Sequence, residues 1–286
     1  MINFTARNMK VFFKDKASVF FAFLSVIIIF ALYALFLGDI WASNISEIPN
    51  ARYIMDSWIC AGMLAVTSLT ATMGAFGIVV EDKYRKIYKD FYASPVKKYQ
   101  LLGGYLLAAV VIGIILTLVT LVFSEIYIVA YGGKLFTVTE LFEVLGLIIL
   151  STLANTSIMF FFVSFFASPN AFSTGCTIIG TLCGFLTGIY LPVGMLPEAV
   201  QYIIKVFPPS HAAVLMRQAI MERPLAEGFA GAPAKALEGY KSYMGVTFTF
   251  GNYTMPAWQS ILILAGSAIL FYALAVIIGS RKQRIK

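Results

Sequence analysis

The chain has 286 residues, of which 60% are hydrophobic and 12% charged, and its mean hydropathy is +0.85. This is more apolar surface than the core of one soluble domain can bury, which excludes a soluble domain. The net charge of +7 comes from basic residues gathered between long apolar stretches, and this distribution argues against a nucleic-acid partner. We therefore expect an all-α integral membrane protein, because lipid offers the peptide backbone no hydrogen-bond partners.

The first sixteen residues have an amphipathic pattern. Apolar residues recur at helical spacing, namely Ile2, Ala6, Met9 and Phe13. Basic residues take the other side, namely Arg7, Lys10 and Lys14. The pattern predicts an amphipathic interfacial helix over residues 1–16 that lies on the inner membrane surface. The alternative is a basic tail that only sets the orientation of the chain.

Six segments reach the length of about 20 apolar residues that a helix needs to cross a hydrocarbon core roughly 30 Å thick. They are Ser18–Leu37, Ser57–Val80, Leu101–Ala130, Leu141–Ala167, Phe172–Leu191 and Trp258–Gly279. The fourth and fifth are joined by so short a connection that they are expected to be antiparallel neighbours. The three cysteines fall inside these segments without metal-type spacing, so we expect packing residues at Cys60, Cys176 and Cys183.

The segment between the second and third predicted spans is highly charged. Nine of the twenty residues 81–100 carry a charge, and an apolar stripe runs through them at helical spacing, namely Tyr84, Ile87, Tyr88 and Phe91. Glu81 and Asp82 stand where the positive end of a helix favours acids, and Ser94-Pro95 favours a helix end. These features predict a short amphipathic helix over residues 81–94. A solvated loop that serves only topology is the alternative.

The basic residues predict the orientation of the chain. Fourteen of the 21 Lys and Arg residues fall in the N-terminal segment, in the charged segment and in the tail over residues 281–286, together with only four acids. Basic segments tend to remain on the cytoplasmic side of a membrane. Both termini and the charged segment are therefore expected to be cytoplasmic.

Residues 192–256 change in character. Pro192 and Pro197 interrupt the fifth predicted span, and apolar residues at helical spacing then predict a short helix ending before Pro208-Pro209. Ser210 is expected to cap a second helix that runs to about Met221. Residues 222–255 are expected to form an external loop, so that an external helical hairpin and loop separate spans five and six.

The sequence has no G-x-x-x-x-G-K-[ST] phosphate-binding motif and no catalytic or metal-binding constellation. Its one histidine, His211, is interpreted as a helix-start residue. Two polar residues inside predicted spans are candidates for a substrate path. Glu125 lies near the external end of the third span, where its carboxylate could equally reach the membrane surface. Asn155 lies in the middle of the fourth span, where a hydrogen bond to another helix is the alternative.

Taken together, these features resemble the membrane subunit of a type-2 ABC exporter, an ABC-2 type permease. The most specific features are Glu81 followed by ASPVKKYQLLGG, and L-P-x-x-V followed by Pro208 and Arg217. The resemblance covers nearly all of residues 1–286 as a single transmembrane domain. The PPSH sequence at residues 208–211 and the long segment over residues 222–255 depart from the family pattern, and they leave the substrate class open.

The resemblance implies a coupling helix that docks on a separate cytoplasmic P-loop ATPase, which binds ATP and Mg²⁺. The implied contact residues are Glu81, Tyr84, Arg85, Ile87, Tyr88 and Phe91, with Tyr88 and Phe91 as the main apolar contacts. It also implies a non-catalytic permease in the cytoplasmic membrane of a bacterium. A second permease subunit, identical or similar, would complete the transporter.

The transported compound is expected to be amphipathic or lipid-like and to pass between the two permease subunits. Glycines in the second and fifth spans would permit close approach there, although packing within the chain is the alternative: Gly62, Gly74, Gly77, Gly175, Gly180, Gly184 and Gly188. An ATP-independent carrier or channel and a non-transporting membrane scaffold are the competing functions. The carrier would be expected to show inverted repeats, which are not evident in the sequence.

Overall fold

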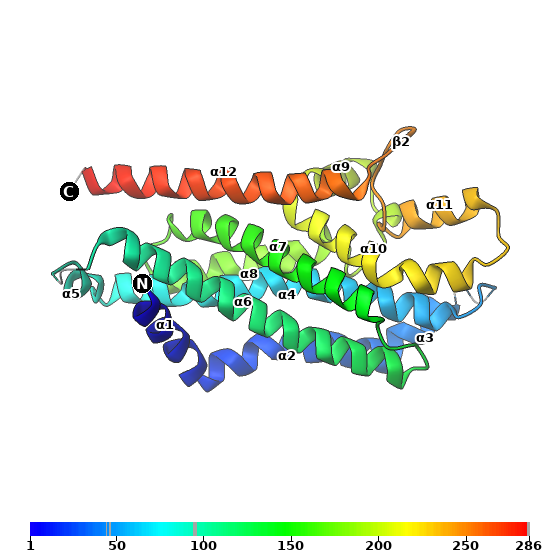
Figure 1. The fold of residues 1–286 in the computed structure, drawn as a ribbon, viewed down its shortest axis with the longest axis horizontal. Coiled ribbons are helices and arrows are strands. Elements are labelled where there is room, and N and C mark those ends of the chain that lie inside the picture. The colour runs from blue at the N-terminus through cyan, green and yellow to red at the C-terminus, as the bar shows by residue number, and fades with distance from the viewer. Residues whose placement is uncertain (44, 46, 94–95, 285–286) are drawn as a thin grey trace.

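The computed structural model describes residues 1–43, 45, 47–93 and 96–284, which form an elongated bundle of helices (Figure 1). The first half contains α1 (Ile2–Lys14), α2 (Lys16–Leu32), the π-helical turn η1 (Tyr33–Leu37), α3 (Gly38–Ser43), α4 (Ala51–Tyr84), α5 (Tyr88–Ala93) and α6 (Lys98–Ala130). The second half contains α7 (Val138–Val163), α8 (Pro169–Leu186), the 3-10 turn η2 (Val193–Met195), α9 (Glu198–Val206), α10 (Pro208–Gly228), α11 (Ala234–Tyr243), the strands β1 (Thr249–Phe250) and β2 (Tyr253–Thr254), and α12 (Ala257–Arg284).

The all-α membrane fold is confirmed in outline, with one short antiparallel hairpin, β1–β2, added to it. Among the described residues, four helices are long and apolar enough to cross a membrane, namely α4, α6, α7 and α12. Helices α2 and α8 occupy the first and fifth predicted spans. Both termini and α5 lie at one end of the bundle, and α3 and α11 lie at the other end (Figure 1).

Helix α4 is the centre of the bundle. It contacts α6, α7, α8 and α10, and 78% of its most apolar stretch is buried, compared with 17% for α12. Small residues allow this crowding. A Cβ atom added at Gly113 of α6 would come within 2.8 Å of Thr72 in α4 and 2.7 Å of Thr152 in α7. A displacement of α4 would therefore reach most of the long helices directly.

The segment over residues 192–256 is more structured than predicted. Helix α9 is confirmed, but α10 begins at Pro208 and continues past Pro224 to Gly228, so its predicted end near Met221 was wrong. Two prolines fit the first helical turn because the N–H groups there have no partner within the helix. Ser210 does not cap α10, because its hydroxyl donates instead to the carbonyl oxygen of Leu186 at 2.7 Å.

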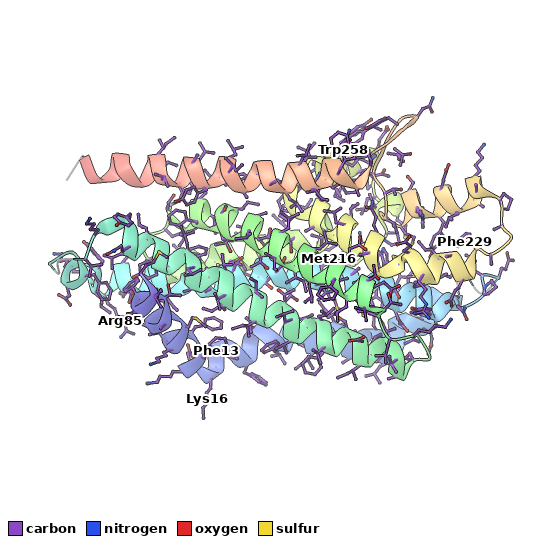
Figure 2. The ribbon with its side chains drawn as sticks, viewed as in Figure 1. Phe13, Lys16, Arg85, Met216, Phe229 and Trp258 are labelled. Atoms are coloured by element: carbon purple, nitrogen blue, oxygen red, sulfur yellow. The ribbon has the colours of Figure 1, made fainter. Side chains whose placement is uncertain are left out.

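The prediction of an external loop over residues 222–255 was also wrong in detail, because this range contains the end of α10, all of α11 and the β1–β2 hairpin. Helix α10 packs against α4, α7 and α12 and buries most of its residues, Met216 among them. Figure 2 shows Met216 within the bundle rather than at its surface. The chain therefore folds back into the bundle after α8 before it reaches α11.

Arg217 of α10 joins three parts of this region. Its side chain is fully buried and donates to the carbonyl oxygens of Gly188 at 2.8 Å and Gly245 at 3.3 Å. Both glycines have a positive φ angle, +66° and +67°, which other residues adopt only with strain. The guanidinium carbon also lies 4.9 Å from the centre of the Trp58 ring, a favourable position for a cation. Arg217 thus holds two tight turns against α4.

His211 joins α10 to α9 and α12. Its Nε2 atom lies 3.0 Å from the carbonyl oxygen of Lys205, and its Nδ1 atom lies 3.0 Å from the hydroxyl of Ser260. A carbonyl oxygen only accepts, so Nε2 carries the proton, and Nδ1 of the neutral ring accepts from Ser260. Burial lowers the pKa of His211 and so favours this neutral ring. His211 is a structural residue of the first turn of α10.

We predict that His211 makes folding sensitive to acid. The pKa of His211 is lower in the folded state than the ordinary value of about 6.5, so its stabilisation is complete above that value and is lost as the pH falls through the folded pKa. The unfolding temperature of the purified protein should therefore fall between about pH 7.5 and 5.5. His211→Gln keeps a donor for Lys205 and does not titrate, so its unfolding temperature should fall less. An equal fall in both proteins would contradict the assignment.

Candidate functional site

One carboxylate connects three helices at the end of the bundle that carries the termini. The Asp82 side chain in α4 is only 5% exposed, and it accepts from Arg7 of α1 at 2.5 and 2.9 Å. It also accepts from the hydroxyl of Tyr105 in α6 at 2.6 Å. The hydrogen bonds to Asp82 raise the pKa of Arg7 above its ordinary value. We refer to Arg7, Asp82 and Tyr105 as the Asp82 junction.

Helix α1 lies close to α6 beside this junction. The Thr5 hydroxyl of α1 approaches the carbonyl oxygen of Gly104 at 3.4 Å. A Cβ atom added at Gly104 would meet the Phe4 ring at 2.7 Å, and one added at Gly103 would lie 3.0 Å from the sulfur of Met1. The close approach therefore depends on two small residues at the start of α6.

The predicted helix over residues 81–94 is not one helix. Glu81, Asp82 and Tyr84 belong to the last turn of α4 rather than to the start of a new helix. The chain then turns at residues 85–87, where Lys86 has a φ angle of +60°, a strained value for a residue with a side chain. Helix α5 begins only at Tyr88. The predicted helix end at Ser94-Pro95 lies outside the described residues.

This break divides the predicted aromatic stripe. Tyr84 is 62% exposed, whereas Ile87, Tyr88 and Phe91 are half-buried. The Phe91 ring meets the Phe4 ring edge to face, with centroids 5.0 Å apart, and lies 5.4 Å from the guanidinium of Arg7. Phe91 therefore packs toward α1 with part of its ring, whereas Tyr84 is largely exposed.

An exposed surface remains around the turn between α4 and α5. We define the docking surface as Tyr84, Arg85, Lys86 and Lys89, all of which are exposed. Arg85 pairs with Glu81 one helical turn earlier. Figure 2 shows Arg85 at the end of the bundle. The docking surface thus presents one aromatic ring among basic side chains, and the Asp82 junction lies directly behind it.

The two candidates for a substrate path have roles within the chain. Asn155 is fully buried, and its Nδ2 atom donates to the hydroxyl of Ser68 in α4 at 2.8 Å, which confirms a hydrogen bond between helices. Glu125 is half-buried, and its carboxylate accepts from the backbone N–H of Phe136 at 3.1 Å. Glu125 thereby holds the connection between α6 and α7. The structure does not bring these two side chains to one site.

Several of the glycines for which the sequence left close approach between subunits and packing within the chain both open are used inside the chain. A Cβ atom added at Gly62 would lie 3.2 Å from Ile189, and one added at Gly175 would lie 2.8 Å from Phe166. The corresponding distance from Gly184 to the Tyr190 ring is 2.2 Å. Gly188 forms the turn after α8. For these four glycines, packing within the chain explains the small residue.

Sequence reasoning missed the Asp82 junction and a second polar cluster at the opposite end of α4. In that cluster Arg52 donates to the buried carboxylate of Asp56 at 3.0 Å and to the hydroxyl of Tyr127 at 3.0 Å. The Tyr131 ring lies 4.3 Å from the guanidinium of Arg52. A charged residue at each end of an otherwise apolar helix, Asp56 and Asp82, was the available signal, because such residues need partners when buried. Their partners come from distant parts of the sequence.

Comparison with known proteins agrees with the fold. Residues 46–277 match the family model described as ABC-2 family transporter protein. The chain therefore belongs to the ABC-2 transporter family, and it is a multi-pass membrane permease. Members of this family generally work with an ATPase. No curated protein matched the chain.

We predict that the Asp82 junction is energetically coupled. Removing one partner leaves the other buried charge without compensation, so Arg7→Gln and Asp82→Asn should each destabilise the protein, and the double variant should lose less than the sum. Because Arg7 is partly exposed, the coupling should be about 1–2 kcal/mol. Unfolding free energies in detergent would measure it.

The exposed pair of Glu81 and Arg85 is the matched control, because its partners lie on the same stretch of chain. Its coupling should be below about 0.5 kcal/mol. If the two cycles gave the same coupling, the Asp82 junction would be an ordinary surface ion pair.

Proposed function

We propose that this chain is the permease subunit of an ATP-driven exporter in the cytoplasmic membrane, powered by a separate P-loop ATPase that binds ATP and Mg²⁺. The observation that carries the proposal is the docking surface, an exposed aromatic and basic patch at the end of the central helix. The family and the absence of a phosphate-binding motif in the sequence support a division of labour between a permease and an ATPase.

The docking surface is suited to receive a protein. An exposed tyrosine surrounded by arginine and lysine has the composition of an interface contact, since aromatic residues and Arg are enriched where protein partners meet. Tyr84 belongs to α4, which contacts α6, α7, α8 and α10. A force that the ATPase exerts on Tyr84 would therefore act on α4, the helix that contacts most of the bundle. Tyr88, half-buried at the start of α5, would complete the contact.

We propose that a second permease subunit, identical or similar, packs beside α8. This helix packs on α4 with one face, and its other face is exposed, including Ile178 and Leu182. Hydroxyl groups follow the exposed face at helical spacing, namely Ser173, Thr177 and Thr181. The hydroxyl groups of Thr177 and Thr181 donate to carbonyl oxygens one turn earlier, at 3.1 and 2.9 Å. These donors are therefore satisfied within the helix, and the face is only weakly polar.

A face of this kind would suit an amphipathic or lipid-like compound, for example a drug, an antimicrobial peptide, a lipid or a glycan. Hydroxyl groups offer weak polar contacts, and the neighbouring aliphatic side chains offer apolar ones. Helix α8 carries no charged residue, so the proposed path does not favour a strongly charged substrate. The proposal includes six spans, with both termini and α5 in the cytoplasm. Both termini and α5 lie at the same end of the bundle, which supports this orientation (Figure 1).

Two other functions would make different predictions. A carrier or channel that needs no ATPase would transport in liposomes alone. A membrane scaffold would recruit a soluble partner through the docking surface without moving a compound. ATP-dependent flux in liposomes that contain the permease and its ATPase would exclude both functions, and flux without ATP would overturn our proposal.

We predict that Tyr84→Ala and Tyr88→Ala weaken ATPase association more than tenfold. Loss of a desolvated aromatic contact typically costs about 2 kcal/mol. Affinity between the purified permease and its ATPase, and transport in liposomes, would measure the effect. Tyr253→Ala, at an exposed tyrosine of the β1–β2 hairpin, is the control and should change neither quantity.

Phe91→Ala should act in a different way. It removes the ring contact with Phe4 and loosens α5 from α1, so it should lower the unfolding temperature of the permease alone. Tyr84→Ala should leave that temperature unchanged, because the Tyr84 side chain is largely exposed. If Tyr84→Ala and Tyr88→Ala both left association and transport intact, the docking surface would have been assigned wrongly.

We predict the topology from the same arrangement. A cysteine introduced at Lys89 should be protected from an impermeant thiol reagent in intact cells and should react after the cells are opened. A cysteine at Gly231, between α10 and α11, should react in intact cells. Reaction at Lys89 in intact cells would contradict the cytoplasmic placement of α5.

A further inference from the structure

Helix α1 presents three different faces. Thr5, Asn8 and Phe12 are buried and form the face that packs on the bundle. Figure 1 shows that α1 runs at an angle to the long helices rather than alongside them. Because one turn of helix contains 3.6 residues, the remaining positions divide between two exposed faces.

The first exposed face of α1 is apolar. Ile2 is 76% exposed and Phe13 is 38% exposed, and Ala6 between them is also exposed. These residues recur at i, i+4 and i+11 and therefore share one side of the helix. A soluble surface rarely exposes such a row, whereas a helix that lies in a membrane interface requires it.

The second exposed face of α1 is basic. Lys10 and Lys14 are exposed and lie next to the apolar row, on the side away from the bundle. Helix α1 contains no acidic residue, and the one acid among these lysines in the sequence is Asp15, which directly follows α1. Lys16, at the start of α2, is exposed as well, and Figure 2 shows it at the corner between α1 and α2, near Phe13 and directed away from the bundle. The three lysines therefore surround one end of the apolar row.

We propose that α1 binds the headgroups of anionic phospholipids through Lys10, Lys14 and Lys16, with Ile2, Ala6 and Phe13 inserted among the acyl chains. Charge complementarity selects an anionic headgroup, because each lysine near a negatively charged membrane gains attraction and a zwitterionic surface offers little. The apolar row selects a membrane rather than a free anion or a soluble protein, since it lies beside the lysines along the same short helix.

Lipid binding would also act on the docking surface. The same helix carries Arg7, which holds Asp82, and Phe4, which holds Phe91 of α5. Lipid bound to the outer side of α1 would stabilise α1 in its position on the bundle. The contacts of Arg7 with Asp82 and of Phe4 with Phe91 would then hold α5 in place. This consequence depends on the proposed function, whereas the lipid site itself does not.

The experiment measures lipid contact directly and needs no ATPase. Phe13→Trp is reconstituted in nanodiscs that contain brominated phosphatidylglycerol in unbrominated phosphatidylcholine, or the reverse. The unsubstituted protein supplies the background from its own three tryptophans. We expect brominated phosphatidylglycerol to quench the introduced tryptophan more strongly at equal mole fraction, because the lysines concentrate that lipid around α1.

Adding Lys10→Gln, Lys14→Gln and Lys16→Gln to Phe13→Trp should reduce the preference for phosphatidylglycerol at least roughly fivefold, since each of these lysines adds attraction to an anionic surface. Replacing the same residues with Arg should preserve the preference. Lys235→Gln with Lys241→Gln, on α11 at the other end of the bundle, is the control and should also preserve it.

Three results would overturn the proposal. Equal quenching by both lipids would show no anionic selectivity. Absence of quenching by either lipid would place α1 away from the membrane. Loss of the preference on addition of inorganic phosphate would indicate a site for a free anion instead of a lipid headgroup. None of these results bears on ATPase binding, so failure here is distinct from failure of the proposed function.

Discussion

The buried carboxylate of Asp82 is the contact on which the rest of the account depends. A carboxylate removed from water is stable only with partners, and Arg7 and Tyr105 supply them from two other helices. The need to satisfy one charge therefore fixes α1, α4 and α6 at the same end of the bundle. Because α5 follows directly after α4 and packs on α1 through Phe91, its position is fixed as well.

A buried carboxylate with partners from other parts of the chain also holds the opposite end of α4. Asp56 is buried there and is satisfied by Arg52 and Tyr127, which tie the end of α6 to the start of α4. Between the two ends α4 has small and hydroxyl-bearing residues, and its neighbours are close. Because α4 contacts α6, α7, α8 and α10, a displacement applied near Tyr84 would act on all four helices. This property gives the docking surface its proposed role.

The sequence predicted an all-α membrane protein correctly, because apolar helices long enough to cross a membrane depend on local composition. The long apolar runs and the helix α9 before Pro208-Pro209 followed from patterns within short stretches, whereas for Asn155 the sequence left a substrate path and an inter-helix hydrogen bond both open. Helical periodicity also predicted one apolar face for Ile2, Ala6, Met9 and Phe13; Ile2, Ala6 and Phe13 are exposed on it, whereas Met9 is half-buried and packs against the core. What periodicity could not supply was the break at Lys86, because a stripe at i, i+3, i+4 and i+7 has the same spacing whether or not the backbone turns within it.

The hydrogen-bond partners of buried polar groups could not be predicted from the sequence either, because tertiary packing determines them. Arg7 and Asp82 are 75 residues apart, and nothing near either residue indicates the other. The same holds for Arg217, whose acceptors are the carbonyls of two distant glycines. The predicted end of α10 near Met221 was wrong for a related reason: α10 continues through Pro224, although proline lacks the N–H group for a helical hydrogen bond, and it packs against α4.

The central claim is that the turn between α4 and α5 touches the ATPase, and site-specific photo-crosslinking tests it most directly. A benzophenone side chain at Lys86 should crosslink the ATPase, identified by its P-loop peptide, and the yield should fall when Asp82→Asn is added because α5 loses its support. The same side chain at Gly251, in the β1–β2 hairpin, should give no such product. An ATPase crosslink from Gly251 but not from Lys86 would contradict the account.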